Sequence, residues 1–353
     1  MNERIRKAET GSDSGRDPVV VLAADEQFAM PLATTVRSAL ENLSTEVKLR
    51  IFVLDGGITE QTKERVVRSW PAGRFEISWV SVDASTLGCP TSMQGSLACY
   101  FRILIPRVLP RDITRVIYLD SDLFIAADLA RLWSQQLSEN ICLAVQDCGA
   151  PFIDSSQALP NYSACAPYIY YPRPISNFRE LGLDPKSAYF NSGVLMIDLD
   201  GWRREDITSQ LITCLTENAE HVHLWDQYAL NVVLARRWGE LDRRWNQGLH
   251  VYQFPSWELS PYSREVLDQQ RNDPFIVHYT TSRKPWKASC QHPQRERFLD
   301  CIQRTDWAGW RIPRLEILAE ALKAQERRFR HGRRWLRDRT LGTLSGNRKR
   351  PAA

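Results

Sequence analysis

Two aspartates separated by one serine, Asp120 and Asp122, stand at the end of the apolar segment 115–120. In an extended chain, residues two apart point to the same side, so both carboxylates can bind one cation. Hard oxygen ligands suit Mg²⁺ or Mn²⁺, which often join a protein carboxylate to substrate phosphates and neutralise a diphosphate leaving group. The pair could instead belong to an Asp-rich turn that caps a helix over 128–133, and the triplet alone leaves both interpretations open.

The first half of the chain alternates apolar runs of strand length with helical patterns. Such alternation predicts an α/β sheet with helices on both faces, which binds ligands at the carboxyl ends of its strands. The predicted strands are 19–24, 49–54, 75–82 and 115–120, and the predicted helices are 31–43, 59–69 and 99–109.

The second half is less regular. Residues 149–187 are rich in Pro, Ser and Tyr and predict a long loop or lid, a kind of segment that is often functional. Strands are predicted over 188–199 and 274–279, and a helix over 226–234.

Charge is unevenly distributed in this chain of 353 residues. Residues 311–353 carry 13 Lys and Arg against 4 Asp and Glu, whereas the rest carries 33 basic and 38 acidic residues. The tail is helical in pattern, and Phe329, Trp335 and Leu336 lie among its arginines, which favours attachment to an anionic membrane surface. Nucleic-acid binding and a solvated, frayed tail are the alternatives.

The N-terminal segment, the apolar runs and the cysteines indicate the cellular compartment of the protein. Residues 1–18 are polar and Gly- and Ser-rich, which predicts disorder and shows no secretory leader. No apolar run is long enough to cross a membrane. The eight cysteines lack C-x-x-C spacing and mostly stand in apolar contexts, which predicts reduced thiols and a cytoplasmic protein.

Seven motifs occur in order between about residues 20 and 290. They are LAADEQF (22–28), YFRILI (100–105), YLDSDLF (118–124), YFNSGVLMIDLDGWR (189–203), WDQYALN (225–231), RWN (244–246) and VHYTTSRKPW (277–286). Together they resemble the family 8 retaining glycosyltransferases, which include bacterial lipopolysaccharide galactosyl- and glucosyltransferases and glycogenin. The resemblance implies one domain over 19–310 with the GT-A fold of nucleotide-diphospho-sugar transferases, a mixed, mostly parallel sheet flanked by helices.

The resemblance also assigns roles in binding the donor. Ala24, Asp25 and Phe28 would form the base-binding set, with Asp25 facing the uracil ring nitrogen and Phe28 stacking on the base. Arg102 would lie near the donor sugar and diphosphate, and Ser121 would also belong to the donor site. From the residues alone, Asp25 could instead cap a helix and Arg102 could instead form a salt bridge within the body.

By the same resemblance, His278 is the third metal ligand beside Asp120 and Asp122, and Lys284 contacts the diphosphate. A single histidine in an apolar strand is otherwise most often packed in the core. Around the transferred sugar the resemblance implies Asp147, Asn191, Asp226 and Gln227, although Asp226 could also cap its helix.

We therefore expect a metal-dependent enzyme that transfers galactose or glucose from a UDP-sugar to a hydroxyl of a surface glycolipid or lipopolysaccharide, with retention of configuration. Mn²⁺ or Mg²⁺ would be the cofactor. One alternative is a protein or self-glycosylating transferase of the glycogenin type that uses a tyrosine in 162–171. Another is a non-enzymatic adaptor that binds through the basic tail.

Overall fold

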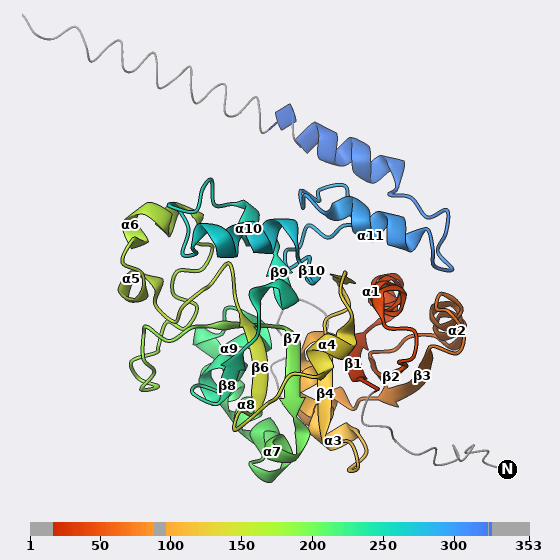
Figure 1. Cartoon of the computed structure of the whole chain (residues 1–353), viewed down its shortest axis with the longest axis horizontal. Coiled ribbons are helices and arrows are strands. Elements are labelled where there is room, and N and C mark those ends of the chain that lie inside the picture. The colour runs from red at the N-terminus through yellow and green to blue at the C-terminus, as the bar shows by residue number, and fades with distance from the viewer. Residues whose placement is uncertain (1–16, 88–96, 324, 327–353) are drawn as a thin grey trace, which may run out of the picture.

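The computed structural model describes residues 17–87, 97–323 and 325–326. Seven strands form one sheet in the order β3-β2-β1-β4-β7-β6-β8 (Figure 1). All run parallel except β7, which is antiparallel to both neighbours, so the predicted mixed, mostly parallel sheet is confirmed. The strands are β1 Val19–Ala24, β2 Leu49–Asp55, β3 Phe75–Ser81, β4 Arg115–Leu119, β6 Cys142–Gln146, β7 Phe190–Asp198 and β8 Trp238–Glu240.

A small second sheet carries part of the later sequence. It has the order β5-β10-β9, with β5 Leu123–Ile125, β9 Gln247–Gly248 and β10 Ile276–His278. Strand β5 follows β4 after only three residues, so this sheet brings the chain near residue 278 beside the end of β4.

The helices pack around the two sheets, and helix α1 packs against β5, α2 and α11. They are α1 Ala29–Asn42, α2 Glu60–Arg68, α3 Ile105–Val108, α4 Leu129–Trp133, α5 Ser155–Ala158, α6 Tyr162–Cys165, α7 Leu199–Arg204, α8 Ile207–Glu217, α9 Trp225–Val233, α10 Arg264–Asn272 and α11 Arg295–Ile302. Figure 1 shows α10 and α11 on the side of the molecule where β9 and β10 lie. Residues 314–323 form a further helix, as the tail pattern predicted, and the rest of the predicted tail helix, apart from 325–326, lies outside the described residues.

Two predictions of secondary structure need correction. The helix expected over 99–109 is a 3-10 helix, η3 Leu97–Leu104, followed by the short α3. Pro106 lacks the N–H that would bond to the carbonyl of Arg102, so an α-helix cannot extend back through this point. Strand β6 was not predicted, and the segment 149–187 contains the short helices α5 and α6 within an otherwise irregular path.

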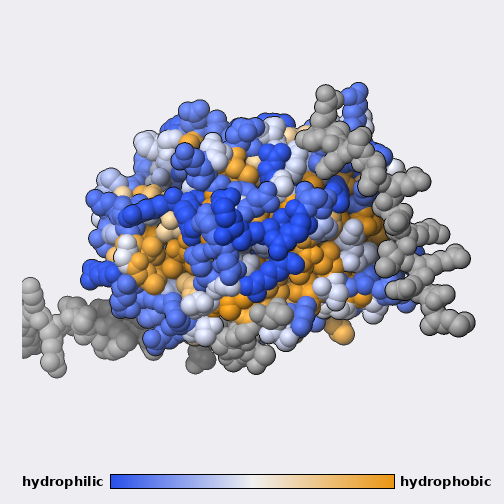
Figure 2. All heavy atoms as spheres, turned by 90° about the horizontal axis from the view of Figure 1, so that it is seen from below, coloured by the Kyte–Doolittle hydropathy of each residue, from blue (hydrophilic) through white to orange (hydrophobic). Residues whose placement is uncertain are grey.

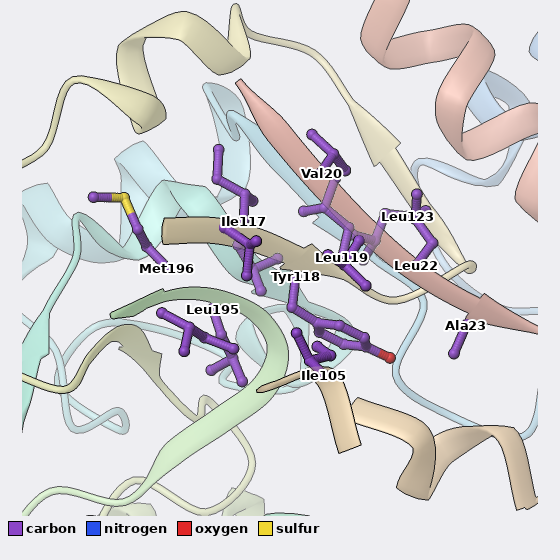
Figure 3. Packing of buried hydrophobic residues seen from close by; sticks show 14 of the residues in the cluster. Val20, Leu22, Ala23, Ile105, Ile117, Tyr118, Leu119, Leu123, Leu195 and Met196 are labelled. Carbon is purple, nitrogen blue, oxygen red and sulfur yellow. The ribbon is translucent and has the colours of Figure 1, made fainter. Parts of the chain in front are cut away.

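The core lies on the central strands. Every residue of β1 is buried, and so are four of the five in β4, because helices cover both faces of this part of the sheet. Figure 3 shows Val20 and Leu22 of β1 packed beside Ile117 and Leu119 of β4. The surface view from below shows polar residues over much of that face, with apolar surface between them (Figure 2).

The structure also bears on the predictions about cysteines, the N-terminal segment and membrane-spanning helices. The seven cysteines among the described residues are free thiols. Disorder was predicted for residues 1–18, and residues 1–16 lie outside the described part of the chain. No helix in the described ranges has both the length and the apolarity that crossing a bilayer requires.

Candidate active site

One edge of the large sheet gathers the candidate residues because of strand direction. Asp120 and Asp147 directly follow the parallel strands β4 and β6, so they lie at the carboxyl edge. Asn191 reaches this edge from the opposite direction, because β7 is antiparallel and its amino end lies there. A cavity of about 570 Å³ opens at this edge, within the usual size range of small-molecule sites.

A bend in β7 shapes the wall of the cavity. Pairing with β6 steps from Leu195 opposite Ala144 to Asn191 opposite Val145, so residues 192–194 are extra on β7. Irregularities of this kind bend a strand and re-aim its side chains, and they are frequent beside active sites. Figure 3 shows the curved ribbon that carries Leu195.

Asp120, Asp122 and His278 form a cluster in which one ligand atom of each residue lies within 4.8 Å of the others. His278 Nε2 is 3.6 Å from Asp120 Oδ2 and 3.4 Å from Asp122 Oδ1. Helix α4 is capped by a different residue, Asp128, whose carboxylate accepts from Ala130 N. The two aspartates are therefore not needed for the cap, and the turn interpretation fails.

The imidazole of His278 is oriented for metal binding. Its Nδ1 lies 2.8 Å from Asn246 Oδ1, while Asn246 Nδ2 donates to Asn191 Oδ1. Since the Asn246 oxygen can only accept, Nδ1 carries the proton and Nε2 presents its lone pair to the aspartates. A second partner that fixes the tautomer in this way is typical of histidine ligands.

Gly193 leaves the space that this cluster needs. A Cβ at this position would lie 2.2 Å from His278 Cε1 and 2.8 Å from Asp120 Oδ2. Any side chain here would fill the cradle between the imidazole and the carboxylate. Two carboxylates, one imidazole with a free Nε2 and an open cradle fit a divalent cation such as Mn²⁺ or Mg²⁺.

Lys284 extends into the same cluster. Its ammonium pairs with the carboxylate of Asp122 and donates to the carbonyl of Tyr279 at 2.7 Å. Burial raises the pKa of the Asp122 carboxyl, but the positive charge of Lys284 and the hydrogen bond from its ammonium outweigh this effect and hold the pKa below its ordinary value. The carboxylate is therefore ready to bind a cation at neutral pH.

Arg102 joins the metal cluster to helix α9. Buried at 4% exposure, its guanidinium lies 3.1 Å from Asp120 Oδ1 and 2.8 Å from Asp226 Oδ2. The salt bridge within the body that the residues alone allowed is thus present. Burial raises the pKa of Asp226 to about 6, opposed by Arg102 and reinforced by Asp120.

Asp226 does not cap its helix. Leu224 is the N-cap of α9, and Asp226 lies inside the first turn, so the capping interpretation is wrong. The Nε hydrogen of Arg102 goes to the carbonyl of Cys99 at 3.0 Å. Among the described residues Asp226 Oδ2 has no hydrogen-bond donor, although the residue lines the cavity.

Asp147, Asn191 and Gln227 form a hydrogen-bonded group on the cavity wall. Asp147 Oδ2 accepts from Asn191 Nδ2 at 2.9 Å and from Gln227 Nε2 at 3.0 Å. Because Asn191 also binds Asn246, one chain of bonds links Gln227 to the metal ligand His278. Sequence reasoning had put these three side chains around one sugar, and the fold brings them together.

Of the three residues expected to bind the base, only two line the cavity. Ala24 and Phe28 line the cavity, and Ser121 lines it too while donating its hydroxyl to the carbonyl of Ala23 at 2.7 Å. Asp25 Oδ1 accepts from Phe28 N at 3.0 Å and caps the 3-10 helix η1 Glu26–Phe28, which is the role the residues alone suggested.

Sequence reasoning missed Asn246, Gly193 and His250 as site residues. Asn246 and Gly193 stand inside the RWN and FNSG segments already singled out, so their motifs contained the information. His250 lines the cavity from η7 Leu249–Tyr252, and no motif marked it.

A large cavity with an Asp-Asp-His cluster suited to a cation, at the carboxyl edge of a mixed sheet, is the arrangement of a glycosyltransferase of GT-A type. The chain belongs to glycosyl transferase family 8, whose model matches residues 19–290.

Several known proteins are similar to this chain. General stress protein A of Bacillus subtilis is 27% identical over 292 residues, covering 82% of this chain and 94% of that protein. Glycosyltransferase GlyF of Streptococcus pneumoniae is 27% identical over 270 residues, 76% of this chain and 56% of GlyF. The solved structure of the galactosyltransferase LgtC with donor and acceptor sugar analogues has the same fold, with a TM-score of 0.66, 24% identity and coverage of 81% of this chain and 96% of LgtC.

Proposed function

We propose that this glycosyltransferase moves galactose or glucose from a UDP-sugar to a hydroxyl of a surface glycolipid or lipopolysaccharide, with retention of anomeric configuration. The proposal rests mainly on the fact that two clusters of side chains line the same cavity. The Asp120, Asp122 and His278 cluster suits a diphosphate-bound cation, and the Asp147, Asn191 and Gln227 group suits a sugar.

Asp120, Asp122 and His278 would hold the metal, which when bound supplies positive charge to the diphosphate leaving group. Lys284 adds a second positive charge beside Asp122, and exchanging that carboxylate for a phosphate oxygen would place it on the diphosphate. Arg102 keeps Asp120 oriented through their ion pair.

The transferred sugar would lie against the polar wall. Asp226, paired with the Arg102 guanidinium, lines the cavity beside this wall and would place negative charge near the sugar. In front-face attack the bond from the sugar C1 to the phosphate oxygen breaks, C1 bonds to the acceptor oxygen, and the departing phosphate takes the acceptor proton. Asp147, Asn191 and Gln227 position the ring and stabilise its oxocarbenium-like charge.

The charged tail supports the proposed location at a membrane. Leu315, Leu318 and Leu322 are 60% or more exposed and recur along the helix 314–323, and the basic residues continue beyond it. Apolar anchors beside net positive charge favour the anionic inner face of a membrane. We therefore propose a cytoplasmic enzyme bound peripherally there.

A second candidate keeps the chemistry and changes the acceptor. Tyr170 is 61% exposed and lines the cavity, as a self-glycosylated tyrosine of the glycogenin type would. Under this candidate, incubation with a UDP-sugar adds hexose mass to the wild-type chain, and the variant Tyr170→Phe gains none.

The first test is a donor screen. Purified protein with Mn²⁺ and no acceptor should slowly hydrolyse one of UDP-galactose and UDP-glucose, and addition of EDTA should stop it. If no UDP-sugar in the screen releases UDP, the proposed donor is refuted.

A further inference from the structure

Two large aromatic side chains remain exposed on the wall of the catalytic cavity. Tyr170 is 61% and Trp225 is 50% exposed, and both line the cavity that holds the cation cluster. A ring of this size gains about 1.5–3 kcal/mol when it is buried, so an exposed ring in a pocket is ready to cover a ligand.

Tyr170 is held in place by its neighbours. Its ring lies 4.9 Å from the imidazole of His250, tilted by 37°, and 4.7 Å from the ring of Tyr171 at 88°. The backbone N–H of Tyr171 donates to the carbonyl of Gly149 at 2.8 Å. The aromatic residues from the irregular segment are thereby bonded to the turn that begins at Asp147.

Gly149 allows this packing. A Cβ at this position would lie 2.7 Å from His250 Nδ1, so only glycine lets the imidazole lie against the backbone and support Tyr170. The N–H of Gly149 in turn donates to Asp147 Oδ1 at 2.7 Å. The aromatic wall and the polar group at Asp147 are thus parts of one connected loop.

Trp225 stands where the backbone is unfavourable for it. Its φ is +49°, in the left-handed region that a bulky side chain rarely adopts and that costs on the order of 1–3 kcal/mol. It is the first residue of α9 and directly precedes Asp226 and Gln227, which are both buried. The strained residue therefore leaves a large ring at the cavity mouth while the next two side chains reach the cavity wall.

We propose that Tyr170 and Trp225 form the acceptor subsite, and that the acceptor is a saccharide whose pyranose ring covers these aromatic faces. This inference rests on the proposed transfer and specifies its acceptor. The C–H face of a pyranose is apolar and suits an aromatic ring, while its rim of hydroxyls suits polar partners. Such partners are near by, because Asp147 is linked to Tyr171 through Gly149 and Gln227 follows Trp225 by two residues.

The role differs from that of a glycosylated tyrosine in one respect. A stacking platform uses the ring of Tyr170 and has no need of its hydroxyl. The variant Tyr170→Phe therefore keeps acceptor use if the ring is a platform and loses it if the oxygen is the acceptor.

The test uses the full chain with lactose, methyl β-galactopyranoside and methyl α-glucopyranoside as probes. Binding is followed by saturation-transfer NMR without donor, and KM and kcat for each probe are measured with the active UDP-sugar. We expect Tyr170→Ala and Trp225→Ala each to raise the acceptor KM about 3- to 10-fold, the equivalent of one aromatic contact. Tyr170→Phe and Trp225→Phe should stay within twofold of wild type.

Trp257→Ala is the matched control, because Trp257 is 39% exposed and does not line the cavity. This variant should bind the probes as wild type does. If the two alanine variants bind like wild type, or if wild type binds none of the saccharides, the inference is overturned. Because binding is measured without donor, it is decided even if no UDP-sugar is hydrolysed, a result that would refute the proposed donor instead.

Discussion

Replacing Gly193 by alanine should remove metal binding through a single methyl group. The φ of Gly193 is not in the left-handed region, so alanine meets no backbone strain there, and the effect comes from the space it fills. A Cβ would lie 2.2 Å from His278 Cε1, whereas ordinary contact begins at 3.4 Å. The imidazole must therefore retreat by about 1.2 Å, the difference between these two distances.

That displacement is large for a metal ligand. Ligand distances in metal sites hold to within about 0.2 Å, so a shift of this size takes Nε2 out of the coordination sphere. Loss of a residue that only hydrogen-bonds a metal ligand weakens metal affinity about 10- to 100-fold. Loss of the ligand itself should therefore weaken Mn²⁺ affinity at least about 100-fold. The cost in folding stability should be about 1–3 kcal/mol, as for other overpacked sites.

Isothermal titration of the metal-free protein with MnCl₂ measures the affinity, and circular dichroism follows the fold. Gly239→Ala is a matched control. Its Cβ would lie 2.7 Å from Leu143 Cδ2, so it overpacks β8 to a similar degree without touching the cluster. Mn²⁺ affinity within twofold of wild type in folded Gly193→Ala would refute the assignment of His278 and the cradle.

Three further predictions concern charge. Asp122→Asn should lower UDP-sugar hydrolysis more than about 100-fold while circular dichroism stays unchanged, and near-normal turnover would exclude the metal assignment. For Asp226, the folded pKa of about 6 exceeds the ordinary 3.8, so its stabilising effect is full below pH 4 and is lost as pH rises through 6. In metal-free protein, urea titrations should show that the free energy of unfolding of wild type falls by up to about 3 kcal/mol over this pH range, relative to that of Asp226→Asn. An equal dependence of the unfolding free energy on pH in the two proteins would contradict the prediction. Deleting residues 315–353 should keep hydrolysis but cut salt-sensitive sedimentation with phosphatidylglycerol vesicles, and equal sedimentation of both forms would show that the tail does not bind lipid.

Much of the fold could be predicted from local patterns. The fully apolar runs at β1 and β4 predicted buried parallel strands, because a strand covered on both faces has no polar side. The pair Asp120 and Asp122 was marked by its place directly after β4, since side chains that follow a parallel strand lie at the ligand-binding edge.

Other elements have weak local patterns. Helix α10 Arg264–Asn272 buries only Leu267 and Gln270, and it contains too few apolar residues to mark it as a helix in the sequence. In η3 the 3-10 geometry follows from Pro106 and from packing against β1, and helical spacing of apolar residues does not distinguish it from an α-helix.

The contacts of the site were decided by tertiary structure alone. The sequence by itself determined strands β1 to β4 and β7 and the position of the Asp120 and Asp122 pair, because these features depend on residues close together in the chain. His278 meets Asp122 only because β10 pairs with β5, and Asn246 lies 32 residues before the imidazole it orients. The role of Tyr170 likewise depends on Gly149 and His250, which are brought beside it from separate segments. Long-range pairing of strands and loops decides such contacts, and no spacing along the chain encodes them.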